Sequence, residues 1–149
     1  MDGVIDEASI TLVSKTKYCL AVLVPCFNEE AAVEMVVTAF KSSLPMAQIY
    51  VYDNNSTDQT IERATAAGAT VRHEVLAGKG NVVRRMFSDV EADIYILVDG
   101  DATYDAASAP DLVAHLINRQ LDMVVGARIS DAKDASYRFG HRFGNTAFT

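Results

Sequence analysis

Residues 18–43, YCLAVLVPCFNEEAAVEMVVTAFKSS, contain the pattern that decides the fold. The first part, Tyr18 to Val24, is a continuous apolar run rich in β-branched and aromatic residues, and Pro25 stops it. Such a run predicts a strand that is buried on both faces. The next part predicts a helix over 29–43, because apolar residues recur there at helical spacing. Its apolar stripe consists of Val33, Val36, Val37, Phe40 and Leu44.

The alternation of strand and helix continues along the chain. Further strands are predicted at 48–52, 70–75, 94–98 and 123–127, with helices between them. Parallel neighbours need crossover connections, which are usually helices, so the sequence predicts an α/β protein with a mainly parallel sheet covered on both faces. In such sheets ligands bind beyond the carboxyl ends of the strands. The apolar faces of the last two helices are predicted to be Val83, Met86, Phe87 and Val90, and then Val113, Leu116 and Ile117.

Composition excludes some classes of protein. The 149 residues include 13 Lys and Arg against 20 Asp and Glu, a formal charge of −7. Nucleic-acid binding is therefore not expected, because nucleic-acid binders present a basic surface to phosphates. Half of the residues are apolar and 22% are charged, which is typical of a globular protein. The length predicts one domain over 18–149, preceded by a loosely ordered leader at 1–17.

Targeting signals and cysteine usage point to the cytoplasm. No apolar run approaches the roughly 20 residues that span a bilayer, and the N-terminus lacks the order of a secretory signal. We therefore expect a cytoplasmic protein. The two cysteines, Cys19 and Cys26, form no metal-binding pattern. We expect both to be reduced and to pack as small buried hydrophobic residues.

The loop after the first strand, residues 25–30 (PCFNEE), lacks the GxGxxG pattern of dinucleotide-binding folds. It offers carboxylates and an aromatic ring instead. Glu29 could accept hydrogen bonds from a base or ribose, and Phe27 could pack on a base. The alternative interpretation is structural: Asn28 caps the following helix, and Glu29 and Glu30 complement its dipole.

A polar cluster, residues 53–58 (DNNSTD), follows the second strand. Asp53 is expected at the tip of that strand, where its carboxylate could accept a hydrogen bond from a nucleobase N–H. Turn formation is an equally good interpretation, because Asn and Asp bond their own backbone, and Thr57 or Asp58 could cap the next helix.

The sharpest feature is the pair of carboxylates in Asp99, Gly100 and Asp101, directly after an apolar strand. Carboxylates near a core are costly unless a cation or hydrogen bonds offset their desolvation. Hard oxygen ligands favour Mg²⁺ or Mn²⁺, which leave coordination positions for phosphate oxygens and water. The alternative interpretation is an exposed Asp-Gly turn.

Basic residues follow two of the predicted strands. Lys79 lies between two glycines, and Arg128 follows the fifth strand. Either could reach a phosphate, and either could be a solvated surface residue. Four basic residues stand against two acidic ones over 128–149, and aromatic residues interleave with the arginines. An anionic partner with an apolar part would suit that segment, as would the start of an amphipathic helix.

Taken together and in this order, the loops resemble those of the family 2 glycosyltransferases. The resemblance covers residues 20–145 and implies a Rossmann-like GT-A nucleotide-diphospho-sugar transferase fold. The stretch YRFGHRFGN (137–145) is most similar to the polyprenyl-phosphate or dolichyl-phosphate branch. The other landmarks are VLVPCFNEE (22–30), YDNNSTDQT (52–60), GKGNVVR (78–84), ILVDGD (96–101) and GAR (126–128).

The resemblance implies roles for particular residues. Asp99 and Asp101 would be the catalytic DxD pair that holds Mg²⁺ or Mn²⁺. Lys79, Arg128 and either Arg138 or Arg142 would meet phosphates, while Pro25, Phe27 and Glu29 would hold the base and ribose and Asp53 would bond the base. The residues expected to bind the nucleotide sugar are Pro25, Phe27, Asn28, Glu29, Asp53, Asn54, Ser56, Lys79, Asp99, Gly100, Asp101, Arg128 and Arg138.

The implied reaction is inverting transfer of a sugar from a UDP- or GDP-sugar. The implied acceptor is a polyprenyl phosphate, which would place the protein at the cytoplasmic face of a membrane, and a homo-oligomer is a further expectation. The resemblance also implies that the domain continues beyond Thr149.

Two other functions fit parts of the sequence. One is a nucleotide-sugar-binding module or subunit without catalysis. The other is a haloacid-dehalogenase-like phosphatase, because IYILVDGDAT (94–103) matches the first motif of that class. Asp99 would then be the nucleophile and Asp101 the acid and base.

Overall fold

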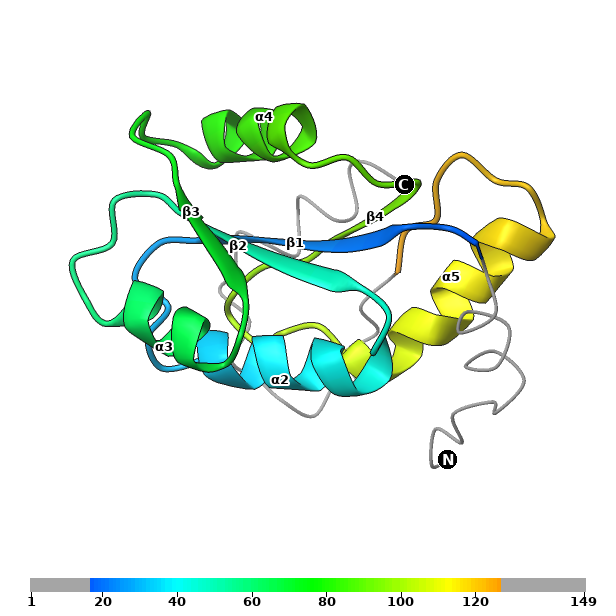
Figure 1. Cartoon of the computed structure of the whole chain (residues 1–149), viewed down its shortest axis with the longest axis horizontal. Helices are drawn as coiled ribbons and strands as arrows, with labels where there is room; N and C mark the ends of the chain where they lie inside the picture. Colours follow the sequence, from blue (N-terminus) through cyan, green and yellow to red (C-terminus); the bar gives the residue numbers. More distant parts are fainter. Residues whose placement is uncertain (1–16, 127–149) are drawn as a thin grey trace, which may run out of the picture.

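The computed structural model of the chain describes residues 17–126. Strands and helices alternate in it, and the strands form one four-stranded sheet with the order β3-β2-β1-β4 (Figure 1). All neighbouring strands are parallel. The elements are β1 (Leu20–Cys26), α2 (Val33–Ser43), β2 (Gln48–Asp53), α3 (Thr60–Ala66), β3 (Thr70–His73), α4 (Lys79–Asp89), β4 (Ile94–Leu97), the 3₁₀ turn η1 (Ala106–Ser108) and α5 (Ala109–Asn118).

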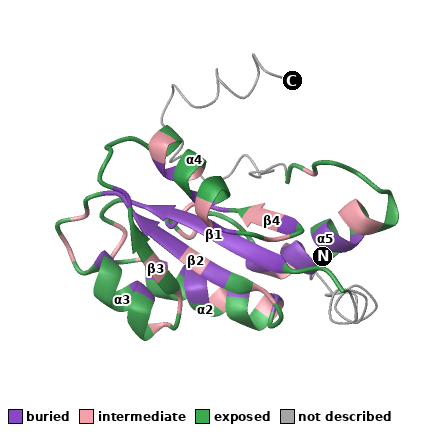
Figure 2. Ribbon diagram, turned by 45° about the horizontal axis from the view of Figure 1, so that its top comes forward, coloured by how far each residue is buried: buried purple, intermediate pink, exposed green. Residues whose placement is uncertain are grey.

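Helices cover both faces of the sheet. Figure 1 shows α2, α3 and α5 on one side and α4 on the other. The strand β1 supplies both hydrophobic layers, because alternate residues of a strand point to opposite faces. Val22 and Val24 pack in the layer with α2, whereas Ala21 and Leu23 pack in the layer with α4. All of β1 is buried (Figure 2), as its continuous apolar run predicts. The predicted α/β fold class is confirmed.

The register of the sheet brings the strand ends together. Cys26 at the end of β1 pairs with Asp53 at the end of β2, and Asp53 pairs with His73 at the end of β3. On the other side of β1, Leu23 pairs with Leu97, the last residue of β4. Because the strands are parallel, the loops that follow them gather at one edge of the sheet.

The strand predicted at 123–127 is wrong where the structure describes it. Residues 123–126 make no ladder, and within residues 17–126 the sheet ends at β4. Met123 and Val125 are 74% and 77% exposed. Apolar residues alone do not make a strand, because a strand needs a neighbour that takes its backbone hydrogen bonds. Ala127 lies outside the described residues.

Some predicted apolar positions are also wrong. Cys19 is exposed because it precedes β1, whereas Cys26 is buried as expected, and both are free thiols. The buried residues of α4 are Val82 and Met86, and Val90 follows at the same spacing just after the helix, so Val82 takes the place predicted for Val83, which is only partly buried. Phe87 is half-exposed and packs edge-on against Tyr95, with ring centroids 5.1 Å apart.

The first helix begins later than predicted. It starts at Val33 rather than at residue 29, and Ala32 precedes it without a side-chain cap. The backbone N–H groups of residues 28–30 donate to side chains of the loop after β2 and to Thr60, the first residue of α3. A single turn, in which Ala32 and Val33 bond the carbonyl oxygen of Glu29, precedes the regular helix. No helix within residues 17–126 is long and apolar enough to cross a membrane. The predicted leader lies outside the described residues except for Lys17, which is exposed.

Candidate nucleotide-sugar site

A cavity of about 310 Å³ opens at the carboxyl edge of the sheet. Its walls come from the loops after β1, β2 and β4 and from the first turn of α4. Eight of the ten lining residues are among those predicted to bind a nucleotide sugar; Cys26 and Val82 are the other two. The lining residues are Pro25, Cys26, Phe27, Glu29, Asn54, Lys79, Val82, Asp99, Gly100 and Asp101.

The loops after β1 and β2 are tied to each other by side chains. Asn28 has a left-handed backbone (φ 54°), which Asn tolerates better than most residues. Its backbone N–H donates to Ser56 Oγ at 2.8 Å, and its Oδ1 accepts the Thr57 N–H at 2.8 Å. The interpretation of Asn28 as the cap of the following helix is therefore wrong. Asn28 and Ser56 do not line the cavity; they brace the two loops that do.

Asp53 lies beneath the cavity rather than on its wall. The residue is fully buried, and both carboxylate oxygens accept the Ser56 N–H, at 3.2 and 3.3 Å. Its Oδ2 also lies 3.1 Å from Nδ1 of His73, at the end of β3. This contact follows from the register between β2 and β3 and could not be read from the two residues separately. Hydrogen bonding of Asp53 to a base stays a prediction.

Three carboxylates surround the open part of the cavity. Burial raises the pKa of Glu29, and the negative charges of Asp101, Asp99 and Asp58 raise it further. Asp101 accepts hydrogen bonds from the backbone N–H and the hydroxyl of Thr103, at 3.1 and 2.6 Å. The raised pKa of Glu29 shows that negative charge is concentrated here, which is the electrostatic condition for holding a cation.

The close approach of two loops depends on Gly100. A Cβ atom at this position would lie 2.5 Å from Cys26 Sγ and 3.4 Å from Cγ of Glu29. The loop that carries Asp99 and Asp101 can therefore lie against the end of β1 only without a side chain here. Cys26 is itself buried there, and burial together with the nearby carboxylates, Glu29 foremost, raises its pKa to about 12. Its thiol thus acts as packing and not as a nucleophile at neutral pH.

The donor set fits Mg²⁺ or Mn²⁺, which prefer carboxylate oxygens. Among residues 17–126, no group of three or more His, Cys, Asp or Glu side chains is arranged to hold a metal ion. A bound ion would therefore take only part of its coordination shell from Asp99 and Asp101. Oxygen atoms of a ligand and water would supply the rest.

One cation faces these carboxylates. Lys79 is the first residue of α4, and its ammonium group pairs with Asp99. The first turn of α4 contains no acidic residue and has no side-chain cap. An uncapped helix N-terminus presents backbone N–H groups that favour an anion. The cavity thus has an acidic wall and a basic wall. Arg128 and Arg138 lie outside the described residues.

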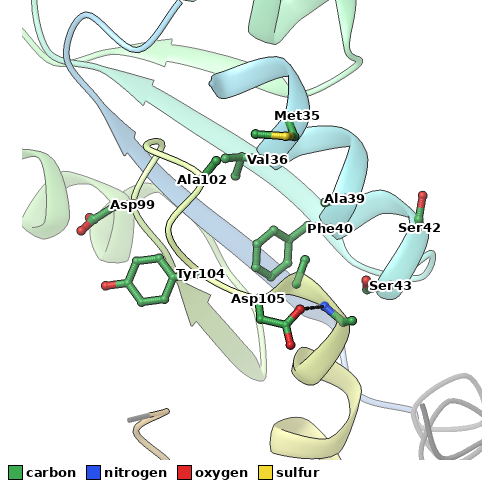
Figure 3. A pocket seen from close by; sticks show the side chains of 12 residues that line it. Met35, Val36, Ala39, Phe40, Ser42, Ser43, Asp99, Ala102, Tyr104 and Asp105 are labelled. Carbon is green, nitrogen blue, oxygen red and sulfur yellow. Dashed lines mark hydrogen bonds between the residues drawn. The ribbon is translucent and has the colours of Figure 1, made fainter. Parts of the chain in front are cut away.

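A second cavity, of about 390 Å³, shares Asp99 with the first. It lies between α2 and the segment after β4, with Met35, Val36 and Phe40 on one side and Tyr104 on the other (Figure 3). Asp105 is turned into the chain, where it accepts the Ala107 N–H at 3.0 Å and begins η1. The mainly apolar lining of this cavity contrasts with the charged lining of the first.

Comparison with known proteins decides the family. The sequence profile described as Glycosyl transferase family 2 matches residues 21–146, most of the chain. The chain belongs to glycosyl transferase family 2. Protein RfbJ of Shigella flexneri is 59% identical over 123 residues, which are 83% of this chain and 95% of RfbJ. Glycosyltransferase AglJ of Haloferax volcanii is 33% identical over 89% of this chain and 45% of its own length.

Similar solved structures support the GT-A fold. Glucosyl-3-phosphoglycerate synthase of Mycobacterium tuberculosis superposes with a TM-score of 0.62 and 28% identity, over 76% of this chain and 45% of that one. The same enzyme in complex with Mn²⁺, UDP-glucose and phosphoglyceric acid superposes with a TM-score of 0.61. Apart from RfbJ, this chain spans about half the length of these relatives. Family membership favours the glycosyltransferase interpretation over the phosphatase interpretation.

Proposed function

We propose that this chain binds a nucleoside diphosphate sugar together with Mg²⁺ or Mn²⁺ and transfers the sugar, with inversion, to an acceptor. The observation that carries the proposal is the cavity whose acidic wall faces Lys79 and the uncapped start of α4. A metal-bound diphosphate needs both walls, because its cation requires carboxylates and its phosphates require N–H donors. The solved relative that holds Mn²⁺ and UDP-glucose supports UDP as the nucleotide.

Each part of the donor has a matching part of the cavity. The ring of Phe27 is 59% exposed, so a base can pack on it, and Glu29 offers oxygens to a ribose. Asp99 and Asp101 would hold the cation, and Lys79 would hold a phosphate. When bound, the cation stabilises the negative charge that develops on the leaving diphosphate.

Sugar transfer requires a nucleophile on the opposite face of the anomeric carbon. An acceptor oxygen forms the new bond to that carbon while the bond to the diphosphate oxygen breaks, and the electron pair leaves with the nucleoside diphosphate. A polyprenyl phosphate is our proposed acceptor. Its phosphate oxygen is already anionic, so no strong general base is needed. The solved relative with phosphoglyceric acid, also a phosphate-bearing acid, supports an anionic acceptor.

Calorimetry on the whole chain tests donor binding. We expect UDP or GDP to bind in the presence of Mn²⁺ or Mg²⁺ and not in the presence of a chelator. Asp101→Ala should abolish this binding, whereas Asp122→Ala, a matched loss of an exposed carboxylate far along the chain, should leave it unchanged. Absence of metal-dependent binding to either nucleotide would contradict the proposal.

Turnover needs a separate measurement. Release of UDP or GDP from its sugar conjugate, with and without polyprenyl phosphate, can be followed by mass spectrometry. Transfer to the lipid phosphate is the expected result. Donor binding without transfer or hydrolysis would identify a nucleotide-sugar-binding module instead.

A further inference from the structure

The loop between β3 and α4, residues 74–78, is held by hydrogen bonds, and the buried amide of Asn54 makes three of them. Asn54 Nδ2 donates to the carbonyl oxygens of Glu74 and Leu76, at 2.8 and 2.9 Å. Its Oδ1 accepts the backbone N–H of Gly78 at 2.8 Å. Asn54 is only 9% exposed, and both of its N–H bonds are used in this way. One side chain after β2 therefore bonds three points of a loop that lies 20 to 24 residues further along the chain.

Other polar groups complete the same arrangement. Asn55 Nδ2 lies 3.2 Å from the carbonyl oxygen of Val75, and Asn81 Nδ2 donates to the carbonyl oxygen of Ala77 at 3.0 Å. The buried carboxylate of Glu74 accepts the Leu76 N–H at 2.7 Å. The carbonyl oxygens of residues 74–77 are thus all directed at asparagine amides.

Hydrophobic packing does little to hold this loop. Val75 and Leu76 are 70% and 61% exposed, so they turn away from the core. The hydrogen bonds of Asn54 consequently determine the path of the chain into Gly78 and α4. Gly78 has φ 117°, a conformation that glycine adopts readily, and Lys79 follows it as the first residue of the helix.

We propose that Asn54 is a positioning residue, which holds the 74–78 loop so that Lys79 and the first N–H groups of α4 face the donor diphosphate. This inference rests on the proposed function. Asn54 lines the cavity, but it acts on the nucleotide through Lys79 rather than through its own amide.

Asn54→Asp is the sharpest variant, because it keeps the size of the side chain and removes both N–H donors. The new carboxylate faces two carbonyl oxygens that it cannot bond. The loop that leads into Lys79 loses two of its hydrogen bonds, so we expect UDP to bind at least about tenfold more weakly with Mn²⁺. Asn118→Asp controls for the added charge, because Asn118 is an exposed residue at the end of α5 that does not line the cavity.

A double-mutant cycle with Lys79→Ala separates positioning from general damage. If Asn54 acts through Lys79 and the first N–H groups of α4, the loss caused by Asn54→Asp should be smaller once Lys79 is gone, because coupled residues are not additive; the part that remains is the contribution of the N–H groups. An equal loss in both backgrounds would overturn the proposal. If Asn54→Asp does not fold, Asn54→Ser removes the same donors without adding a charge and serves in the same cycle.

Hydrogen exchange tests the loop without any nucleotide. In Asn54→Asp, the amides of residues 74–79 should exchange at least about tenfold faster, while those of β1 keep their protection. Unchanged exchange in the loop would overturn the proposal even if UDP binds well. Faster exchange in a chain that binds no nucleotide would instead contradict the proposed function and leave the loop-holding role of Asn54 established.

Discussion

Gly100 provides a quantitative test of the site, because the space for its side chain is already taken. A Cβ atom there would lie 2.5 Å from Cys26 Sγ. Atoms in favourable contact stand about 3.5–4.0 Å apart, so Gly100→Ala requires a displacement of about 1 Å. Cys26 is 3% exposed, so its Sγ has little room to turn aside, and we expect the loop that carries the two aspartates to move.

Two effects follow from that displacement. Overpacking of this kind costs about 1–3 kcal/mol, and we expect the free energy of unfolding in urea to fall by that amount. A shift of about 1 Å in a catalytic group can reduce a rate by about 10²-fold. In Gly100→Ala we therefore expect a large loss of sugar transfer and of metal-dependent UDP binding in a chain that still folds.

Gly80→Ala is the matched control. No atom lies within 4 Å of a Cβ at this position, which is the second residue of α4. Replacing a helical Gly by Ala stabilises a protein by about 0.5–1 kcal/mol, so this variant should be at least as stable as the wild type.

Cys26→Ala should partly rescue Gly100→Ala, because it removes the sulfur that causes the overlap. The two changes should then be less destabilising together than the sum of the single changes, by about 1 kcal/mol. The reasoning is refuted if Gly100→Ala has the free energy of unfolding and the UDP affinity of the wild type. It is also refuted if the effects of Cys26→Ala and Gly100→Ala on the free energy of unfolding are simply additive.

Three further outcomes can be measured. At pH 8 the folded chain should be alkylated at exposed Cys19 and not at Cys26. Burial and the nearby carboxylates raise the pKa of Cys26 to about 12, so its thiol stays protonated. Peptide mass mapping would detect modification at either residue. Because the pKa of Glu29 is raised in the folded state, its contribution to stability is present below the unfolded value near 4.5 and is lost as the pH rises through the folded value. Glu29→Gln should therefore gain stability relative to the wild type between pH 4 and pH 7 in urea unfolding, and a relative loss over that interval would contradict the assigned cause. Lys79→Ala should strengthen the binding of Mn²⁺ alone, because it removes the ammonium group that pairs with Asp99. The same variant should weaken the binding of UDP in the presence of Mn²⁺. If calorimetry shows both affinities rising or both falling, the result contradicts the assigned role of the pair.

The layers of the fold could be predicted from the sequence because they depend on periodicity. The continuous apolar run at 18–24 corresponds to a strand buried on both faces, and the spacing of Val33, Val37 and Phe40 gives the buried side of α2. Parallel topology then brings the loops after β1, β2 and β4 to one edge, which is why most predicted residues line one cavity. The strand at 123–127 failed the same reasoning, because pairing depends on a partner that the local pattern does not contain.

The roles of individual loop residues could not be predicted, because each role depends on hydrogen bonds to groups elsewhere in the chain. The bond between Asp53 and the Ser56 N–H agrees with the turn interpretation of 53–58, but nothing in that stretch indicates the contact of Asp53 with His73. The same holds for Asn54, whose partners are carbonyl oxygens of a loop with no polar signature of its own. The residue types that follow the strands indicate which ligands the carboxyl edge of the sheet could bind. Only the hydrogen bonds of the folded chain show which of these residues face the cavity and which support it.

The charges of the cavity explain why donor binding should depend on a metal. Within residues 17–126, three carboxylates, Glu29, Asp99 and Asp101, line it together with one ammonium group, that of Lys79. Two like charges 4 Å apart at a protein surface repel by roughly 4 kcal/mol, whereas a hydrogen bond to a base or ribose contributes about 0.5–1.5 kcal/mol. A hydrogen bond to the nucleoside is therefore too weak to offset the repulsion between the diphosphate and these carboxylates. A divalent cation bound between the carboxylates and the diphosphate turns this repulsion into attraction. Under the proposed function this need would increase during transfer, because the departing nucleoside diphosphate would gain a further negative charge, so the arrangement that holds the donor would also favour its cleavage.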